Sequence, residues 1–292
     1  MAPDDLERFL SNVDRGRRNF LKQIIAGAAF APPLIASFSL EGPSVTPAEA
    51  SDHLSCYPGI PGLTFDFSGT QYADHFTGIL RPALINPGTD LADGGQSSLN
   101  FTGSTGSGGG TWMTLFDSPI PIPEAGCALS LSADVLFHTF NNMKGAGLLA
   151  LFNVGAGEQG VAVLVSDAGN TDKFQLVTVD QAGKPTVLPA SGPDKTNLPL
   201  GSAIIENLWY RLTMDIVVSG LNVTVIGNVF RHTVPTDPDS DPEPASFGTV
   251  RFSGTLPTGV PSSGQVGLVA RAVSAVVNLS VTNFHIESDD LT

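Results

Sequence analysis

Two sets of side chains alternate along residues 209–216: the apolar residues Tyr210, Leu212, Met214 and Ile216, and between them Trp209, Arg211, Thr213 and Asp215. Successive side chains of an extended strand point to opposite faces, so Trp209, Arg211 and Asp215 are predicted to share one face. On such a face an aromatic ring can stack on the C–H groups of a sugar while neighbouring charges bond its hydroxyls. We therefore predict that these three residues bind a ligand. The alternative, in which Trp209 packs in the core, remains open because both faces of an inner sandwich strand can be covered.

A second group of polar residues, Asp237, Asp239 and Asp241, alternates through a proline-rich segment. Carboxylate oxygens are the ligands that calcium prefers, which makes these residues a candidate metal site. A calcium loop of the EF-hand type beginning at Asp237 would need Gly and Glu at its sixth and twelfth positions, where this chain has Pro242 and Gly248. Two interpretations remain, a solvated acidic loop and a calcium site of low affinity. Calcium is the only cofactor that the sequence suggests.

Other patterns that carry chemistry are absent from the sequence. The five histidines show no metal-binding spacing, and neither a G-x-S-x-G elbow nor a phosphate-binding loop is present. Residues 155–160 match the G-x-G-x-x-G pattern, but that pattern needs a helix N-terminus directed at a pyrophosphate. The β-branched residues 161–165 that follow are typical of a strand. We therefore interpret residues 155–160 as a glycine-rich hairpin.

The chain has two cysteines, Cys56 and Cys127. In an oxidising compartment they are predicted to form a disulfide. It would close a loop of about 70 residues and contribute on the order of 4 kcal/mol in the chain-entropy model. A metal site is disfavoured because only His53 lies near Cys56, and no ligand type lies near Cys127.

The elements that must position these residues are predicted to be strands. Apolar and polar residues alternate with period two over 129–137, and no long segment after residue 50 has helical spacing with caps. Glycine-rich turns separate the strand-like runs, and 86–111 is predicted to form flexible loops around one short strand at 98–102. This pattern predicts an antiparallel sandwich or barrel. The further strand-like runs are 147–154, 161–166, 174–180, 209–218, 221–230, 249–253, 265–270 and 279–287.

The sequence is strongly acidic. It has 14 Lys and Arg against 28 Asp and Glu, for a net charge of −14. Such a surface repels phosphate backbones, so we expect no nucleic-acid partner. Gly and Pro are abundant, but aliphatic residues are plentiful enough for a hydrophobic core.

Four segments together resemble the concanavalin A-like lectin and glucanase superfamily. They are 208–215, the hairpin strand 221–226, 264–271 and 281–286, and the resemblance covers about residues 63–288. It implies an all-β fold, an antiparallel two-sheet jelly-roll sandwich, and carries no activity with it. The glucanase members use E-x-D-x-x-E or E-x-D-x-E on a strand, and no glutamate after residue 50 starts such a motif.

The N-terminal segment resembles a twin-arginine export signal. Arg17 and Arg18 precede Phe20, Leu21 and Lys22, and a mildly apolar run follows. Two prolines interrupt that run, and residues 48–50 supply a small-x-small cleavage site. An N-terminal amphipathic helix is the alternative. We predict a signal peptide over 1–50, the twin-arginine translocase as its partner, and one β-sandwich domain over 51–292.

These expectations combine into one leading hypothesis. The chain is predicted to be a non-catalytic, exported β-sandwich that binds glycan or another envelope component, in the periplasm or outside the cell. No stable membrane span is expected after cleavage. Two alternatives remain, a polysaccharide-cleaving enzyme with an unrecognised carboxylate site and a structural surface protein.

Overall fold

The computed structural model describes 14 segments of the chain, and all statements of structure below refer to them. The chain divides into two units, of which one comprises residues 1–53 and 239–243 and lies outside the described residues. The predicted export signal at Arg17 and Arg18, Cys56 and the three aspartates at 237, 239 and 241 also lie outside them. The described segments are 62–90, 96–104, 110–121, 127–140, 143–153, 159–167, 171–190, 192–201, 204–219, 222–232, 248–257, 259–260, 263–272 and 276–290.

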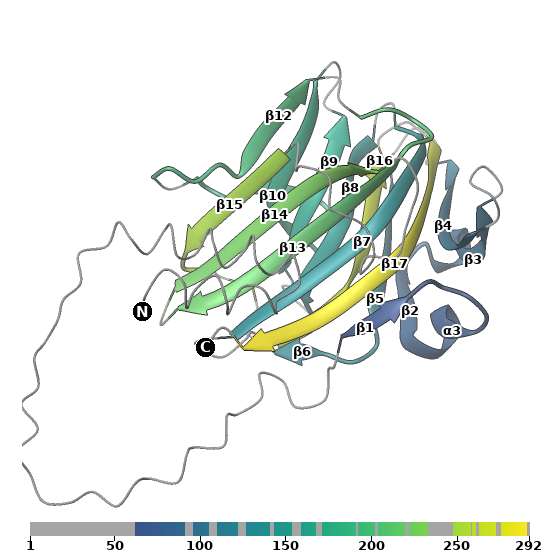
Figure 1. Cartoon of the computed structure of the whole chain (residues 1–292), viewed down its shortest axis with the longest axis horizontal. Helices are drawn as coiled ribbons and strands as arrows, with labels where there is room; N and C mark the ends of the chain where they lie inside the picture. Colours follow the sequence, from purple (N-terminus) through teal and green to yellow (C-terminus); the bar gives the residue numbers. More distant parts are fainter. Residues whose placement is uncertain are drawn as a thin grey trace, which may run out of the picture. The chain divides into compact units, whose positions relative to one another are not determined.

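The described strands form two antiparallel sheets (Figure 1). In spatial order, the eight-stranded sheet contains β15 (Gly248–Gly254), β14 (Asn222–His232), β13 (Trp209–Ser219), β7 (Cys127–Thr139), β17 (Val276–Asp290), β4 (Gln96–Ser104) and β3 (Ile85–Asp90), with β1 (Leu63–Phe65) paired to β17. The nine-stranded sheet contains β11 (Pro185–Val187), β10 (Asp172–Asp180), β9 (Gln159–Asp167), β8 (Met143–Phe152), β16 (Ser263–Ala272), β5 (Gly110–Phe116) and β2 (Phe76–Leu80), with β12 (Asn197–Gly201) paired to β10 and β6 (Ile120–Pro121) to β16.

The chain crosses repeatedly between the two sheets, as a jelly roll does. The strand β7 lies in the eight-stranded sheet, β8 to β10 lie in the other, β13 to β15 return, and β16 and β17 are again divided. The predicted fold class, an antiparallel two-sheet jelly-roll sandwich, is therefore confirmed. The described helices are short: α3 (Gln71–His75) and the 3-10 helix η1 (Pro82–Leu84).

The strand predictions hold best where apolar and polar residues alternate. Every strand-like run from residue 129 onward corresponds to an observed strand, and β8 and β9 pair in antiparallel fashion. The last two residues of the glycine motif, Gln159 and Gly160, begin β9 and not a helix, whereas residues 155–158 lie outside the described segments, so the hairpin itself stays a prediction. The prediction of loops over 86–111 is partly wrong. Residues 86–90 belong to β3, and their pairing with β4 supplies the backbone hydrogen bonds that a loop would lack.

The main core lies between the sheets and takes alternate residues from each strand. The apolar face predicted for β13, with Tyr210, Leu212, Met214 and Ile216, is buried there. The Tyr210 hydroxyl accepts a hydrogen bond from the Ile205 N–H at 2.7 Å. Burial raises the pKa of Tyr210 above its usual value, and the hydrogen bond with Ile205 opposes that rise. Tyr210 is therefore packed as a neutral core residue at pH 7.

A second apolar cluster covers the opposite face of the nine-stranded sheet. In β8, for example, Leu148 faces the main core and the next residue, Leu149, belongs to this second cluster. We call it the outer apolar cluster. Its buried members are Met113, Leu115, Leu149, Phe152, Ala162, Leu164, Val177, Val179 and Val269.

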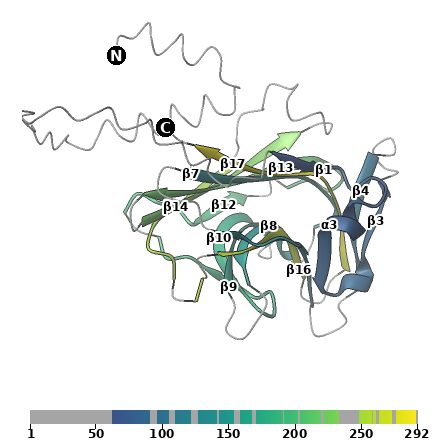
Figure 2. The same ribbon diagram turned by 90° about the horizontal axis from the view of Figure 1, so that it is seen from below.

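The nine-stranded sheet curls around the outer apolar cluster, and Figure 2 shows the bend through β10, β8 and β16. The turn after β10 reaches β5, although β9, β8 and β16 lie between these strands in the sheet. The Thr111 hydroxyl donates to the carbonyl oxygen of Ala182 at 3.0 Å, and Arg271 Nη1 donates to the same oxygen at 3.4 Å. A Cβ added at Gly183 would collide with the Cγ2 atom of Thr111. We call this crossing the strap, residues 181–183.

Candidate functional site

The residues predicted to bind a ligand lie on β13, on the face turned away from the main core. The structure places Trp209, Arg211 and Asp215 there, as the alternation predicts. Trp209 is 2% exposed and Arg211 is 4% exposed. A stacking platform needs an accessible ring, so the burial of Trp209 favours its alternative role in packing. The ligand-binding assignment of the three residues stays a prediction.

Arg211 forms a buried ion pair with Asp134 of β7, its neighbour in register. Its Nε and Nη2 donate to the two carboxylate oxygens, each at 2.9 Å. The Asn283 Nδ2 donates to Asp134 Oδ2, also at 2.9 Å. A bulge in β17 between Thr282 and His285 brings Asn283 into place, with its φ of 49° in the left-handed region. Asp134 is fully buried, and this network compensates for its lost hydration.

Asp215 is also occupied within the fold. The Ser130 hydroxyl of β7 donates to Asp215 Oδ1 at 2.7 Å. On the same face, Asn228 Nδ2 donates to the Thr213 hydroxyl at 3.2 Å. The face therefore contains a continuous set of cross-strand polar pairs, which we call the polar outer face. These pairs fix the register of β14, β13, β7 and β17.

One arrangement on the polar outer face resembles a nucleophile with its base. His138 Nε2 lies 3.0 Å from the Ser280 hydroxyl, and His138 Nδ1 lies 3.4 Å from Asn207 Oδ1. The single Ser280 proton is donated to Asn100 Oδ1 at 2.7 Å, so it is not directed at His138. Ser280 is 2% exposed. We therefore assign this group to cross-strand hydrogen bonding and not to catalysis.

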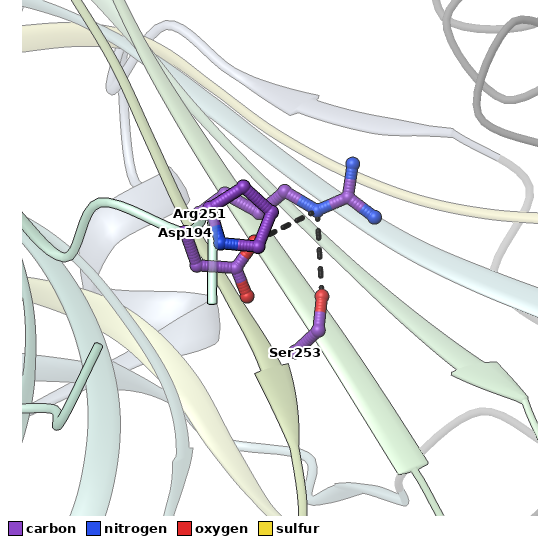
Figure 3. Close-up of a pocket in the computed structure, with 4 residues that line it drawn as sticks. Asp194, Arg251 and Ser253 are labelled. Carbon is purple, nitrogen blue, oxygen red and sulfur yellow. Dashed lines mark hydrogen bonds and ion pairs between the residues drawn. The ribbon is translucent and has the colours of Figure 1, made fainter. Parts of the chain in front are cut away.

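An open pocket lies at the edge of the eight-stranded sheet beside β15. Its lining residues are Pro193, Asp194, Arg251 and Ser253, and its volume is about 510 Å³. The first two residues belong to the segment between β11 and β12, and the other two point from β15 (Figure 3). No sequence motif marks any of these four residues.

The segment that carries Pro193 and Asp194 is held firmly at both ends. The Thr196 hydroxyl donates to the carbonyl oxygen of Leu188 at 2.6 Å, and Leu176 of β10 forms backbone hydrogen bonds with both residues. Within the same segment, the carbonyl oxygen of Lys195 accepts a hydrogen bond from the Arg251 N–H of β15 at 2.8 Å. This bond covers part of the exposed edge of β15 with main chain. It also sets Asp194 next to the Arg251 side chain.

Arg251 is the most accessible charged group in the pocket. Its Nε lies 3.5 Å from Asp194 Oδ1 and donates to the Ser253 hydroxyl at 3.3 Å, while the Ser253 hydroxyl lies 3.4 Å from that of Thr224 (Figure 3). The side chain of Arg251 is 53% exposed, whereas that of Asp194 is 7% exposed. Asp194 thus fixes one edge of the guanidinium, and the other edge remains accessible.

The pocket can bind polar groups but contains one carboxyl group only. Glycosidases need two carboxyl groups about 5 to 10 Å apart, so these lining residues give the polysaccharide-cleaving alternative no support. Arg and Ser are donors that can bond sugar oxygens, and the Pro193 ring adds apolar surface. The four residues thus offer a ligand one guanidinium, one hydroxyl and one apolar ring.

Comparison with known proteins identifies no family for this chain. No protein-family model matches it, and no curated protein does. Among solved structures it is similar to peanut lectin with a nine-residue peptide, at 11% identity over 78% of this chain and 98% of that chain, with a TM-score of 0.47. The Lotus tetragonolobus seed lectin matches at 11% identity over 73% and 92%, with a TM-score of 0.45. Lectin I of Ulex europaeus, in complex with the methyl glycoside of α-L-fucose, matches at 10% identity over 80% and 99%, with a TM-score of 0.43.

These similarities concern the sandwich fold, so the assignment of a site depends on this chain's own residues. Within the described segments, no three His, Cys, Asp or Glu residues form a metal-binding group. The predicted calcium ligands Asp237, Asp239 and Asp241 lie outside those segments, and calcium stays a prediction. Cys127 begins β7 and is not a free thiol. Its predicted partner Cys56 is outside the described residues. No described helix is long and apolar enough to span a membrane.

Proposed function

We propose that the chain is an exported, non-catalytic β-sandwich protein that binds glycan through the pocket beside β15. The observation that supports this function is the accessible guanidinium of Arg251, held by Asp194 and Ser253 next to the Pro193 ring. Donors that converge beside an apolar ring are suited to a sugar oxygen and its neighbouring C–H groups. We place the site here and not at Trp209, because Trp209 is buried.

The export half of the proposal depends on the N-terminal sequence. Arg17 and Arg18, the apolar run and the cleavage site at residues 48–50 support transport by the twin-arginine translocase to the periplasm or beyond. An oxidising compartment would also suit the disulfide predicted between Cys56 and Cys127. Cell fractionation tests this directly. Wild-type protein is expected outside the cytoplasm, and protein with Arg17→Lys and Arg18→Lys inside it; equal export of both would refute the signal.

A glycan array tests the binding half, using protein purified after expression of the full chain. We expect the wild type to bind at least one glycan and Arg251→Ala to lose that binding while it remains folded, because Arg251 is half exposed. Arg231→Ala is the matched control, since it removes one exposed Arg from the adjacent strand β14.

Two results would contradict the proposed site or function. Binding that survives Arg251→Ala and is lost in a folded Trp209→Ala variant would move the site to the polar outer face. Failure of the wild type to bind any glycan would refute glycan binding itself.

A further inference from the structure

The side chains of the pocket beside β15 present an accessible guanidinium, while their acceptor oxygens, on Asp194 and Ser253, already face Arg251 Nε. A guanidinium is donor-only, and it is the exposed charged group of the pocket. The carboxylate that could accept hydrogen bonds belongs to Asp194, whose side chain is 7% exposed and already faces Arg251 Nε. A neutral sugar hydroxyl is best bound by a donor and an acceptor together, so this arrangement suits an acidic group on a sugar better than a neutral hydroxyl.

The accessible edge of Arg251 has the geometry that an oxyanion requires. Its Nε is used by Asp194 and Ser253, and no partner of Nη1 or Nη2 is found within the described part of the chain. Figure 3 shows both terminal nitrogens on the side of the guanidinium that is turned away from Asp194. Two parallel N–H donors on one planar group match the two oxygens of a carboxylate or sulfate.

The negative net charge of the chain restricts where an acidic ligand can bind. The chain carries a net charge of −14, so a polyanion is repelled by most of its surface. An acidic ligand therefore needs a specific cationic contact at short range, which Arg251 provides. Asp194 limits the orientations of that contact, because the ion pair and the Ser253 hydrogen bond both hold Nε.

We propose that the pocket selects acidic polysaccharides by binding a carboxylate or sulfate group on the accessible edge of Arg251. The inference rests on the proposed glycan-binding function and specifies its ligand class. Ser253 and Pro193 then contact the sugar next to the acidic group. Arg251→Lys retains the charge but loses the paired donors, so it distinguishes bidentate recognition from simple attraction.

Dextran, carboxymethyl-dextran and dextran sulfate provide a matched series, because they share one backbone and differ in charged group. Alginate and polygalacturonate add two natural carboxylate polymers. The protein is purified after expression of the full chain, and its binding to each polymer is measured by calorimetry at low and high salt. We expect at least one acidic polymer to bind about tenfold more tightly than dextran, and Arg251→Ala to remove that preference. Arg251→Lys should keep only part of the preference for the acidic polymer, and Arg231→Ala should keep the whole preference.

Each outcome decides the proposal. Preference for a carboxylate polymer or for dextran sulfate identifies which oxyanion is bound. Acidic binding that is indifferent to Arg251→Ala overturns both the inference and the pocket as the glycan site. Equal binding of dextran and its acidic derivatives overturns the inference and leaves the glycan-binding function intact. If the protein binds neutral glycans on the array but no acidic polymer, the inference is likewise overturned and the glycan-binding function stands. Loss of all glycan binding would overturn the function as well. Sodium acetate and sodium sulfate are included as competitors. Full competition by either salt at the same anion concentration would show that the free anion alone is recognised, which overturns selection of acidic polysaccharides.

Discussion

The two sheets of this sandwich cover their outward sides in opposite ways. The nine-stranded sheet curls around aliphatic residues and crosses them with the strap, so that its outer apolar cluster is as buried as the main core. The eight-stranded sheet carries cross-strand polar pairs, including the buried Asp134–Arg211 pair. Both follow from the same strand alternation, in which every second residue faces outward.

This difference shows where binding can occur. Burial of apolar groups is favourable but not directional, so the outer apolar cluster stabilises the fold but offers a ligand no directional contact. The polar outer face is directional, but its side chains bind one another. An accessible polar group remains at the edge of that face, where β15 meets the segment with Asp194.

The largest expected effect tests the polar outer face. Asp134→Ala should lower the free energy of unfolding by about 3–5 kcal/mol, because it removes the carboxylate that neutralises the buried Arg211. Denaturant unfolding followed by intrinsic fluorescence measures this loss.

A double variant distinguishes the cost of leaving one charge unpaired from the net contribution of the Asp134–Arg211 ion pair. Asp134→Leu combined with Arg211→Met replaces both charges by apolar groups and should lie within about 1 kcal/mol of the wild type. If Asp134→Ala instead lowers the free energy of unfolding by no more than the loss of a surface ion pair, about 1 kcal/mol, the polar outer face contributes little to stability. The contrast drawn between the two sheets would then be wrong.

The outer apolar cluster is tested by Leu149→Ala. Leu149 is fully buried, so its truncation should cost about 2–4 kcal/mol through lost burial and a cavity. Chemical unfolding of Val187→Ala serves as the reference, because Val187 is an exposed aliphatic residue in β11 of the same sheet. Equal effects of the two variants would mean that the cluster is not a second core.

The smallest effect concerns the strap. Gly183→Ala should cost about 1–2 kcal/mol, because Gly183 has a φ of 69° and an added Cβ would collide with Thr111. Thermal unfolding and amide hydrogen exchange of β5 report the change. Gly192→Ala is the matched control, since it has a similar φ of 62° but no atom within 4 Å of an added Cβ. A larger loss for Gly192→Ala would show that the strap contact is dispensable.

The sequence predicts this fold well where its pattern is periodic. Residues 209–218 alternate clearly, and the structure buries Tyr210 and Met214 in the main core as expected. The strand β5 gives no such signal, because residues 111–116 are buried on both faces and follow a glycine run. Continuous burial removes the alternation on which a strand is recognised.

The candidate site is much harder to predict from the sequence than the fold. Asp194 and Arg251 lie 57 positions apart and meet only because the Leu188–Thr196 segment is pinned against β10 and β15. No local motif encodes that contact. Similarly, the face of Arg211 is predictable from alternation, but its pairing with Asp134 depends on the register between β13 and β7. A charged residue on a predicted inner strand was the available signal for such a pair.

The position of β17 has a consequence for synthesis of the protein. This strand follows every other described strand in the chain, yet it lies between β7 and β4 and also pairs with β1. A nascent chain that ends before residue 276 therefore leaves two long strand edges without partners. Such edges template association with other chains, so ribosome stalling or proteolysis in this interval should yield aggregates and not a smaller stable domain.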